Sequence, residues 1–252
     1  MIPHSRFYFA ATHFLPTNLG VIRNLHRKRF WPILIARWNF FAMRKPPRTL
    51  ITPEGFSIGS VQELVSYWGM YVERDLWDPE WIKPLQAAVA PIVIDVGANY
   101  GLFCHLIRRL NTAAKIFAFE PQPRFCQLIR SMNIPCSSIA LSDRKEKATL
   151  HLSPGQGETA SLTDYADSGR EMEIETDRLD DIWDRDQKPV LVKIDVDGFE
   201  CNVVKGGQRV LGEVPFIIVE IVEVSSVPII DQMLPRHRRR KISAIDYLYS
   251  LR

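Results

Sequence analysis

Two short runs of acidic and glycine residues have the composition of a binding site. One contains Asp95, Gly97 and Gly101, and the other contains Asp195 and Asp197. An apolar stretch precedes each run, which is typical of a buried strand that ends near the acid. In open parallel sheets, ligands bind outside the carboxyl ends of the strands. The two runs together therefore predict a cofactor pocket and a reaction pocket at neighbouring strand ends.

The first run favours a cofactor that presents a positive charge. Gly97 and Gly101 permit positive φ and a close approach of a ligand to the backbone. Glu120 follows Gly97 by 23 residues, near the ~20 expected for an acid that accepts hydrogen bonds from a ribose. The turn lacks a complete GxGxxG pattern, and Asp95 would repel the pyrophosphate of a dinucleotide. Asp95 suits the amino-acid cation of S-adenosylmethionine (SAM), so the pattern favours SAM over NAD.

The second run predicts the group that handles the acceptor. Methyl transfer from a sulfonium is an in-line displacement, in which the enzyme aligns the acceptor and removes its proton. We predict Asp195 as the base or as the residue that orients the acceptor, and a structural N-cap of the next helix is the alternative. A Mg²⁺ ion between Asp195 and Glu220 is a further alternative, although the prediction we adopt contains no metal.

Strand and helix patterns alternate after residue 91 and must position these acids. Strands are predicted at 92–95, 115–120, 138–142, 190–195 and 215–221, with helices at 102–110, 121–132 and 201–211 between them. This alternation predicts a parallel sheet covered on both faces, with right-handed crossovers. Residues 147–152 and 171–176 alternate with period two, as half-exposed strands do. The intervening Gly- and Ser-rich segment, 153–170, is either a lid over the cofactor or a surface loop.

The two ends of the chain are basic, whereas the middle is acidic. The 252 residues carry a net charge of +3 and are 46% hydrophobic, which suits one sizeable α/β domain with appendages. Residues 1–53 contain nine Lys or Arg and no acid, which leaves −6 for the rest. A second basic run spans 236–241. The ends favour an ordinary extension packed on the domain, an anionic membrane surface with a lipid-linked substrate, or a polyanion such as RNA.

Composition changes divide the chain into four segments. We predict a basic aromatic extension over 1–53, a helical lead-in that can cap the substrate over 54–90, a SAM-binding domain over 91–222 and a basic helical tail over 223–252. In the lead-in, Ser60 begins a capping box. Four aromatic residues of the lead-in precede the cofactor domain: Trp68, Tyr71, Trp77 and Trp81. The four cysteines lack zinc-like spacing and indicate free thiols. The absence of an apolar run of ~20 residues or a signal peptide predicts a cytoplasmic protein, with peripheral membrane association as an option.

Five motifs in order resemble the FkbM-type SAM-dependent methyltransferase family. They begin at Asp95, Phe119, Ala140, Leu179 and Lys193. The resemblance implies a Rossmann-like class I methyltransferase fold, a three-layer sandwich with a mostly parallel sheet. It implies acceptors that are hydroxyl groups of a sugar, glycan or secondary metabolite. The residues implied to bind the methionine part of SAM are Asp95, Gly97, Ala98, Asn99 and Gly101; those for the ribose are Glu120 and Pro121, and those for the adenine are Ser142 and Asp143. Asp195 is implied to lie beside the transferable methyl.

The chain departs from the family pattern in two places. Asp197 stands where the family usually has Glu, so we keep Asp197 as a second catalytic candidate with a shorter reach. The final strand pair of the family is expected to be missing. This predicts either a shortened C-terminus, or an edge completed by the N-terminal extension or by a second protomer in a homodimer. Alternatives to the sugar methyltransferase are a nucleic-acid methyltransferase and a non-catalytic SAM-fold scaffold.

Overall fold

The protein divides into two compact units, residues 1–77 and 78–252. The computed structural model describes residues 50–51, 57–58, 76–152, 160–162 and 170–252. Within the first unit, β1 (Leu50–Ile51) and β2 (Ser57–Ile58) form an antiparallel pair. Most of the predicted basic extension, the capping box at Ser60 and the aromatic pair Trp68 and Tyr71 lie outside the described residues.

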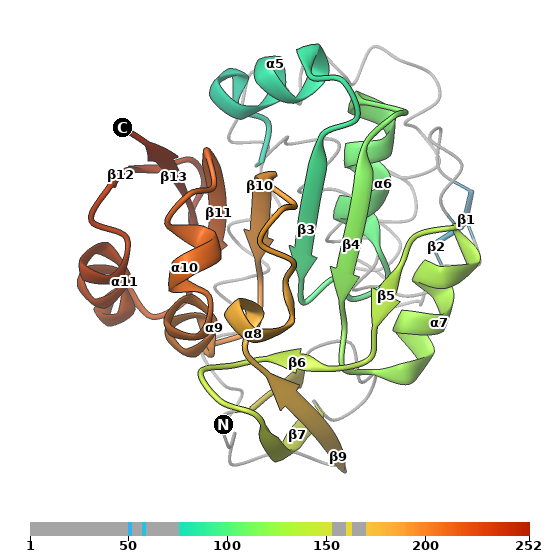
Figure 1. Cartoon of the computed structure of the whole chain (residues 1–252). Coiled ribbons are helices and arrows are strands. Elements are labelled where there is room, and N and C mark those ends of the chain that lie inside the picture. Colours follow the sequence, from blue (N-terminus) through green and yellow to red (C-terminus); the bar gives the residue numbers. More distant parts are fainter. Residues whose placement is uncertain (1–49, 52–56, 59–75, 153–159, 163–169) are drawn as a thin grey trace, which may run out of the picture. The chain divides into compact units, whose positions relative to one another are not determined.

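The second unit is built on a seven-stranded sheet with the order β12-β13-β11-β10-β3-β4-β5 (Figure 1). Five neighbouring strands are parallel, and β13 runs antiparallel to both β11 and β12. The strands are β3 (Ile92–Val96), β4 (Lys115–Phe119), β5 (Cys136–Ser137), β10 (Pro189–Ile194), β11 (Phe216–Glu220), β12 (His237–Lys241) and β13 (Asp246–Leu251). The predicted parallel core is therefore confirmed.

Helices connect the strands and cover the sheet (Figure 1). They are α5 (Pro79–Ala87), α6 (Leu102–Leu110), α7 (Pro123–Ser131), α8 (Leu179–Ile182), α9 (Glu200–Gly206), α10 (Gln208–Leu211), η3 (Val224–Ser226) and α11 (Val227–Met233). α5 begins where the Asp78 carboxylate accepts a hydrogen bond from the backbone N–H of Glu80 at 2.9 Å, with Pro79 at the first helical position. Alternate residues of β3 and β10, such as Ile94 and Val192, join one core with side chains of α9, α10 and α11. The other set, which includes Asp95 and Lys193, lies on the opposite face of the sheet, since successive side chains alternate.

A smaller four-stranded sheet, with the order β6-β9-β7-β8, lies beyond the carboxyl end of the main sheet. Its strands are β6 (Ala140–Leu141), β7 (Glu146–Leu152), β8 (Ala160–Ser161) and β9 (Arg170–Asp177). The prediction that residues 138–142 form the third strand of the main sheet is wrong. Cys136 and Ser137 occupy that edge instead, and Ala140 and Leu141 pair with the end of β9. A short apolar run indicates burial without indicating which sheet buries it.

The C-terminal segment corrects a second prediction. Residues 237–241 and 246–251 form an antiparallel strand pair, so the expected helical tail and the missing final strands are wrong, and only Val227–Met233 is α-helical. β13 is buried from Asp246 to Ser250 between β11 and β12. The basic run is an edge strand whose Arg and Lys side chains face solvent, which discourages pairing with further strands. The seven strands are completed within this unit. In the part of the chain that the structure describes, no helix is long and apolar enough to cross a membrane.

Candidate functional site

A pocket opens at the carboxyl ends of β3, β4 and β10, where the two acid-glycine runs meet. It contains about 630 Å³ of empty space, including open solvent at its mouth. Its walls combine a few polar groups with apolar side chains from both sheets. The lining residues are Val96, Gly97, Asn99, Phe119, Glu120, Pro121, Gln122, Ala140, Leu141, Leu150, Leu162, Asp195, Val196, Asp197 and Phe199.

The glycine turn after β3 allows two strand ends to approach each other closely. Gly97 has φ +75°, and a Cβ there would lie 1.8 Å from the backbone oxygen of Asp195. Gly101 has φ +83° at the start of α6. Asn99, between them, also adopts positive φ, at 50°. The turn therefore brings the predicted cofactor loop against the predicted reaction loop, and a side chain at Gly97 would block this contact.

Glu120 is held at the pocket wall by two backbone donors. The backbone N–H of Asn99 donates to one carboxylate oxygen at 2.8 Å, and that of Gln122 donates to the other at 2.9 Å. Burial raises the pKa of Glu120 to about 7, against the effect of these two hydrogen bonds. Each oxygen keeps a lone pair for a further donor. Two adjacent hydroxyl groups, as on a ribose, match this arrangement, and Gln122 is a wall residue that the motifs did not indicate.

Asp95 lies beneath the pocket and does not line it. Its side chain is fully buried, and one carboxylate oxygen accepts a hydrogen bond from the Cys104 thiol at 3.1 Å. The other oxygen, Oδ1, is buried without a hydrogen-bond partner. Burial raises the pKa of Asp95. The unpartnered oxygen fits a cationic ligand group nearby, and contact between Asp95 and a cofactor stays a prediction.

The predicted adenine-facing pair, Ser142 and Asp143, lies outside the pocket wall. Lys205 of α9 donates to the Asp143 carboxylate at 2.8 Å. This hydrogen bond lowers the pKa of Asp143 to about 2. A Cβ at Gly206 would lie 1.8 Å from the backbone oxygen of Ser142, so α9 packs directly on this turn. Their neighbours Ala140 and Leu141 do line the pocket, and an adenine-binding role for the pair stays a prediction. Ala98 and Gly101 also lie outside the wall and are buried behind it.

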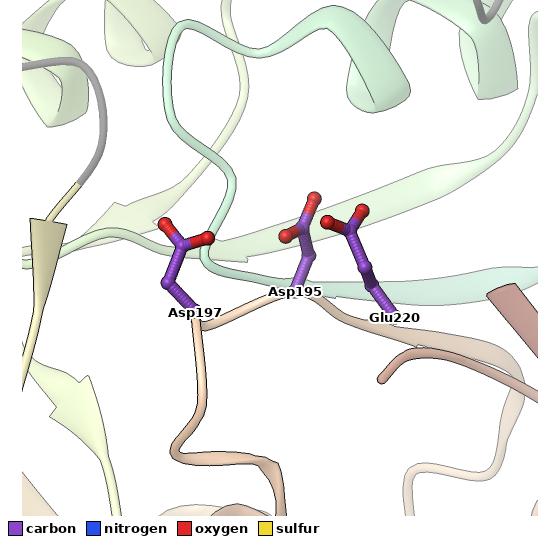
Figure 2. Close-up of side chains that lie close together, drawn as sticks. All are labelled: Asp195, Asp197 and Glu220. Carbon is purple, nitrogen blue, oxygen red and sulfur yellow. The ribbon is translucent and has the colours of Figure 1, made fainter. Parts of the chain in front are cut away.

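Three carboxylates gather at the reaction end of the site, and we call Asp195, Asp197 and Glu220 the acidic cluster (Figure 2). One carboxylate oxygen from each lies within 4.8 Å of the others. Asp195 and Asp197 follow β10, and Asp197 adopts φ 49°. Glu220 ends β11, which runs parallel to β10 with Ile194 beside Val219. The sheet register therefore places Asp195 next to Glu220.

Lys193 is the buried counter-ion of this region. Its ammonium group donates to an oxygen of Asp195 and lies 5.7 Å from the centre of the Phe103 ring. Burial alone would lower the pKa of Lys193, but the carboxylates of Asp195, Asp95 and Glu220 together hold it above its ordinary value. Lys193 is therefore charged at neutral pH. It belongs to a sequence motif, yet only the structure shows that it faces several acids at once.

A fourth carboxylate, Asp246 on β13, lies directly opposite Glu220 in the antiparallel ladder. Asp246 is 5% exposed, and one of its oxygens accepts a hydrogen bond from the Ser243 hydroxyl, whereas Oδ1 is buried without a partner. The neighbouring Asp195 carboxylate raises the pKa of Glu220 well above its ordinary value. Burial raises the pKa of Asp246 to about 6. The site thus has Glu120 at one end and a dense group of acids at the other.

Comparisons of the sequence with known proteins find methyltransferases. The sequence profile described as the methyltransferase FkbM domain matches residues 95–249. The 2-O-methyltransferase NoeI of Sinorhizobium fredii is 30% identical over 154 residues, which cover 52% of this chain and 63% of that relative. Hexuronic acid methyltransferase AglP of Haloferax volcanii is 30% identical over 215 residues, which cover 81% of this chain and 84% of that relative. A solved SAM-dependent O-methyltransferase of Thermotoga maritima aligns with a TM-score of 0.42 and 12% identity over 82% of this chain and 78% of that chain.

Proposed function

The chain belongs to the FkbM methyltransferase family and uses SAM as its cofactor, and we propose that it methylates a hydroxyl group of a sugar or glycan. Two relatives support this acceptor class, since one is named a 2-O-methyltransferase and the other a hexuronic acid methyltransferase. The observation that supports the proposal best is the pocket itself. Glu120 at one wall offers acceptor oxygens to a ribose, and Asp195 at the other offers a carboxylate to an incoming hydroxyl.

We propose that one end of the pocket binds the cofactor and that the other end binds the acceptor. Glu120 is fixed by the N–H groups of Asn99 and Gln122, so its carboxylate has one orientation before any ligand arrives. The apolar wall from Leu141 and Leu150 suits the flat face of an adenine. When bound, the cofactor supplies an electrophilic methyl group on a sulfonium, and the protein has to align an acceptor oxygen with it.

Asp195 is the residue that we propose to orient the acceptor and to receive its proton. Its side chain is 31% exposed toward the pocket, and its Oδ2 is fixed by Lys193. Holding one oxygen leaves the carboxylate a defined direction for a hydrogen bond from the acceptor hydroxyl. Asp197 lines the same pocket and is proposed as a second contact to the acceptor.

Three cations of the basic C-terminal run are paired with acids of the same unit. Arg238 and Arg240 pair with Glu80 at 3.1 Å and 2.9 Å, and Arg239 pairs with Asp231 at 3.0 Å. These pairs weaken the case for a nucleic-acid acceptor bound by Arg238, Arg239 and Arg240.

The test of the proposed function is transfer of a labelled methyl group from SAM to defined acceptors. The panel should contain neutral monosaccharides, hexuronic acids, oligosaccharides that contain either, and a short RNA. The expected product is a methylated sugar, with the position of the methyl assigned by mass spectrometry. Labelled RNA with no labelled sugar would overturn the acceptor class while leaving the cofactor assignment intact. Asp195→Asn, measured in parallel, distinguishes enzymatic transfer from background methylation.

A further inference from the structure

The acidic cluster gathers several carboxylates in a small volume. Asp195, Asp197 and Glu220 lie together, and Asp246 adds a fourth carboxylate on the same face of the sheet. Lys193 donates to Asp195. Carboxylates this close repel one another strongly, and a cation bound among them would relieve that repulsion.

We propose that Asp195, Asp197 and Glu220 bind a divalent metal cation of the Mg²⁺ or Mn²⁺ class. The arrangement of the ligands supports this. Two come from the loop after β10 and one from the end of β11, and their carboxylates point the same way from these neighbouring strand ends (Figure 2). Carboxylate oxygens are the ligands that hard divalent cations prefer. Opposite oxygens around such an ion are separated by roughly twice a metal–oxygen distance of about 2.1 Å. The observed limit of 4.8 Å is close enough for rotation of the side chains to close the site.

Asp246 supplies an independent reason to expect a cation. Asp246 is only 5% exposed, yet its Oδ1 has no hydrogen-bond partner. A buried carboxylate oxygen without a partner is costly, and charged groups are normally paired or bound to metals. Asp246 faces Glu220 across the ladder, and side chains directly opposite in an antiparallel pair lie on the same face. A cation, or a water bound to it, would satisfy this oxygen.

The metal site refines the proposed function and rests on it for its purpose. A divalent ion beside Asp195 would bind the acceptor oxygen and make its hydroxyl more acidic, so that a weak base suffices. The ion would also offset the charge of the cluster when an acidic sugar approaches. Lys193 holds Oδ2 of Asp195. The other oxygen has two lone pairs, so it can bind the metal and still accept the proton of the acceptor hydroxyl.

Metal binding can be measured without methyl transfer. Mn²⁺ added to the full-length chain should be followed by electron paramagnetic resonance, which reports the free ion, both with and without S-adenosylhomocysteine. We expect one saturable site in the wild type. Glu220→Gln should weaken binding at least about tenfold, and Asp246→Asn should weaken it less. Glu223→Gln, an exposed acid on the adjoining loop, is the matched control and should bind like the wild type.

The outcomes separate the metal site from the cofactor site. Glu220→Gln removes one of several mutually repelling charges, so it should fold, and a thermal melt would check this. No saturable Mn²⁺ binding in either state, or equal weakening by Glu220→Gln and Glu223→Gln, would overturn the metal site. Calorimetric titration of S-adenosylhomocysteine on the same samples reports the cofactor pocket independently. A failed metal site with intact cofactor binding would leave the proposed function standing.

Discussion

Replacing Glu120 with Gln should change how stability depends on pH more than it changes stability itself. Burial raises the pKa of Glu120 from 4.5 to about 7. The folded protein therefore binds this proton more tightly than the unfolded chain does. Stability is present in full below pH 4.5 and is lost as the pH rises to about 7. Gln does not ionise, so the variant escapes this loss.

The magnitude follows from the size of the shift. A difference of one pKa unit corresponds to about 1.4 kcal/mol, so ionisation of Glu120 costs the free protein roughly 3 kcal/mol above pH 7. About 2 to 3 kcal/mol of this cost develops between pH 5 and pH 8. Gln has a separate cost, because its NH₂ group must face one of the N–H donors of Asn99 and Gln122. A buried donor left unpaired costs about 1 to 3 kcal/mol, and this cost does not vary with pH.

Urea unfolding of both proteins at pH 5 and pH 8 isolates the ionisation of Glu120. Relative to the wild type, the variant should gain about 2 to 3 kcal/mol between the two pH values. A difference that stays constant within about 0.5 kcal/mol would refute the assignment of a buried, weakly acidic Glu120. The affinity of the wild type for S-adenosylhomocysteine should also fall below pH 7, by up to about tenfold per pH unit. The variant should bind more weakly at high pH and show no such slope.

Four further substitutions test the positions around the pocket. Gly97→Ala combines positive φ with a collision against the Asp195 backbone, so it should lower the free energy of unfolding by about 2 to 4 kcal/mol. Gly101→Ala also strains a residue with positive φ, but the nearest atom to its new Cβ would lie on the Ile129 side chain, at 3.1 Å, so it should lower the free energy of unfolding less. Equal melting temperatures of the two variants would contradict this. Lys193→Met leaves buried carboxylates without their counter-ion and should cost about 3 to 5 kcal/mol, measured by chemical denaturation; a loss below about 1 kcal/mol would show that Lys193 is not their main partner. Asp143→Asn should weaken the packing of α9 on the 142–143 turn and leave S-adenosylhomocysteine affinity within about twofold, since Asp143 is engaged by Lys205 outside the pocket wall; a tenfold loss of affinity would restore its predicted role at the adenine.

Much of the fold could be predicted because burial and turn chemistry leave local signals. The strand that ends near Asp95 and the strand that ends near Asp195 are buried along most of their length, and their apolar runs are short and bounded by glycine or acid. The turn from Gly97 to Gly101 requires positive φ at both ends, and the glycines at these positions indicate this in the sequence. The order of these elements then fixes a parallel sheet, because crossovers between parallel strands follow one hand.

The errors came from segments whose structure depends on the strands that they pair with. His237 to Lys241 is mostly charged, and its strand character comes from pairing with β13, so no apolar pattern marks it. Ala140 and Leu141 belong to the smaller sheet because they pair with β9, which lies much later in the sequence. Propensity cannot specify such pairings, because a strand is stabilised by the neighbours it meets.

The sequence indicated residues of the pocket wall, but not the position of Asp95 beneath the wall or the presence of Asp246. Glu120 and Asp195 lie at the pocket wall, as their spacing suggested. Asp95 lies one layer below, because its side chain points into the sheet face that α6 covers, where Cys104 contacts it. Asp246 could not be found from a motif, since its place opposite Glu220 exists only once the final hairpin pairs with β11.

We propose that one pocket binds SAM through Glu120 and its neighbours and presents the acceptor to Asp195. Calorimetric titration with S-adenosylhomocysteine, with NAD as the control ligand, tests it most directly when wild type and Asp195→Asn are compared and methyl transfer is measured on the same samples. We predict one-to-one binding of S-adenosylhomocysteine by both proteins, no binding of NAD, and loss of methyl transfer only in the variant. Binding of NAD alone, or full methyl transfer by Asp195→Asn, would contradict the account.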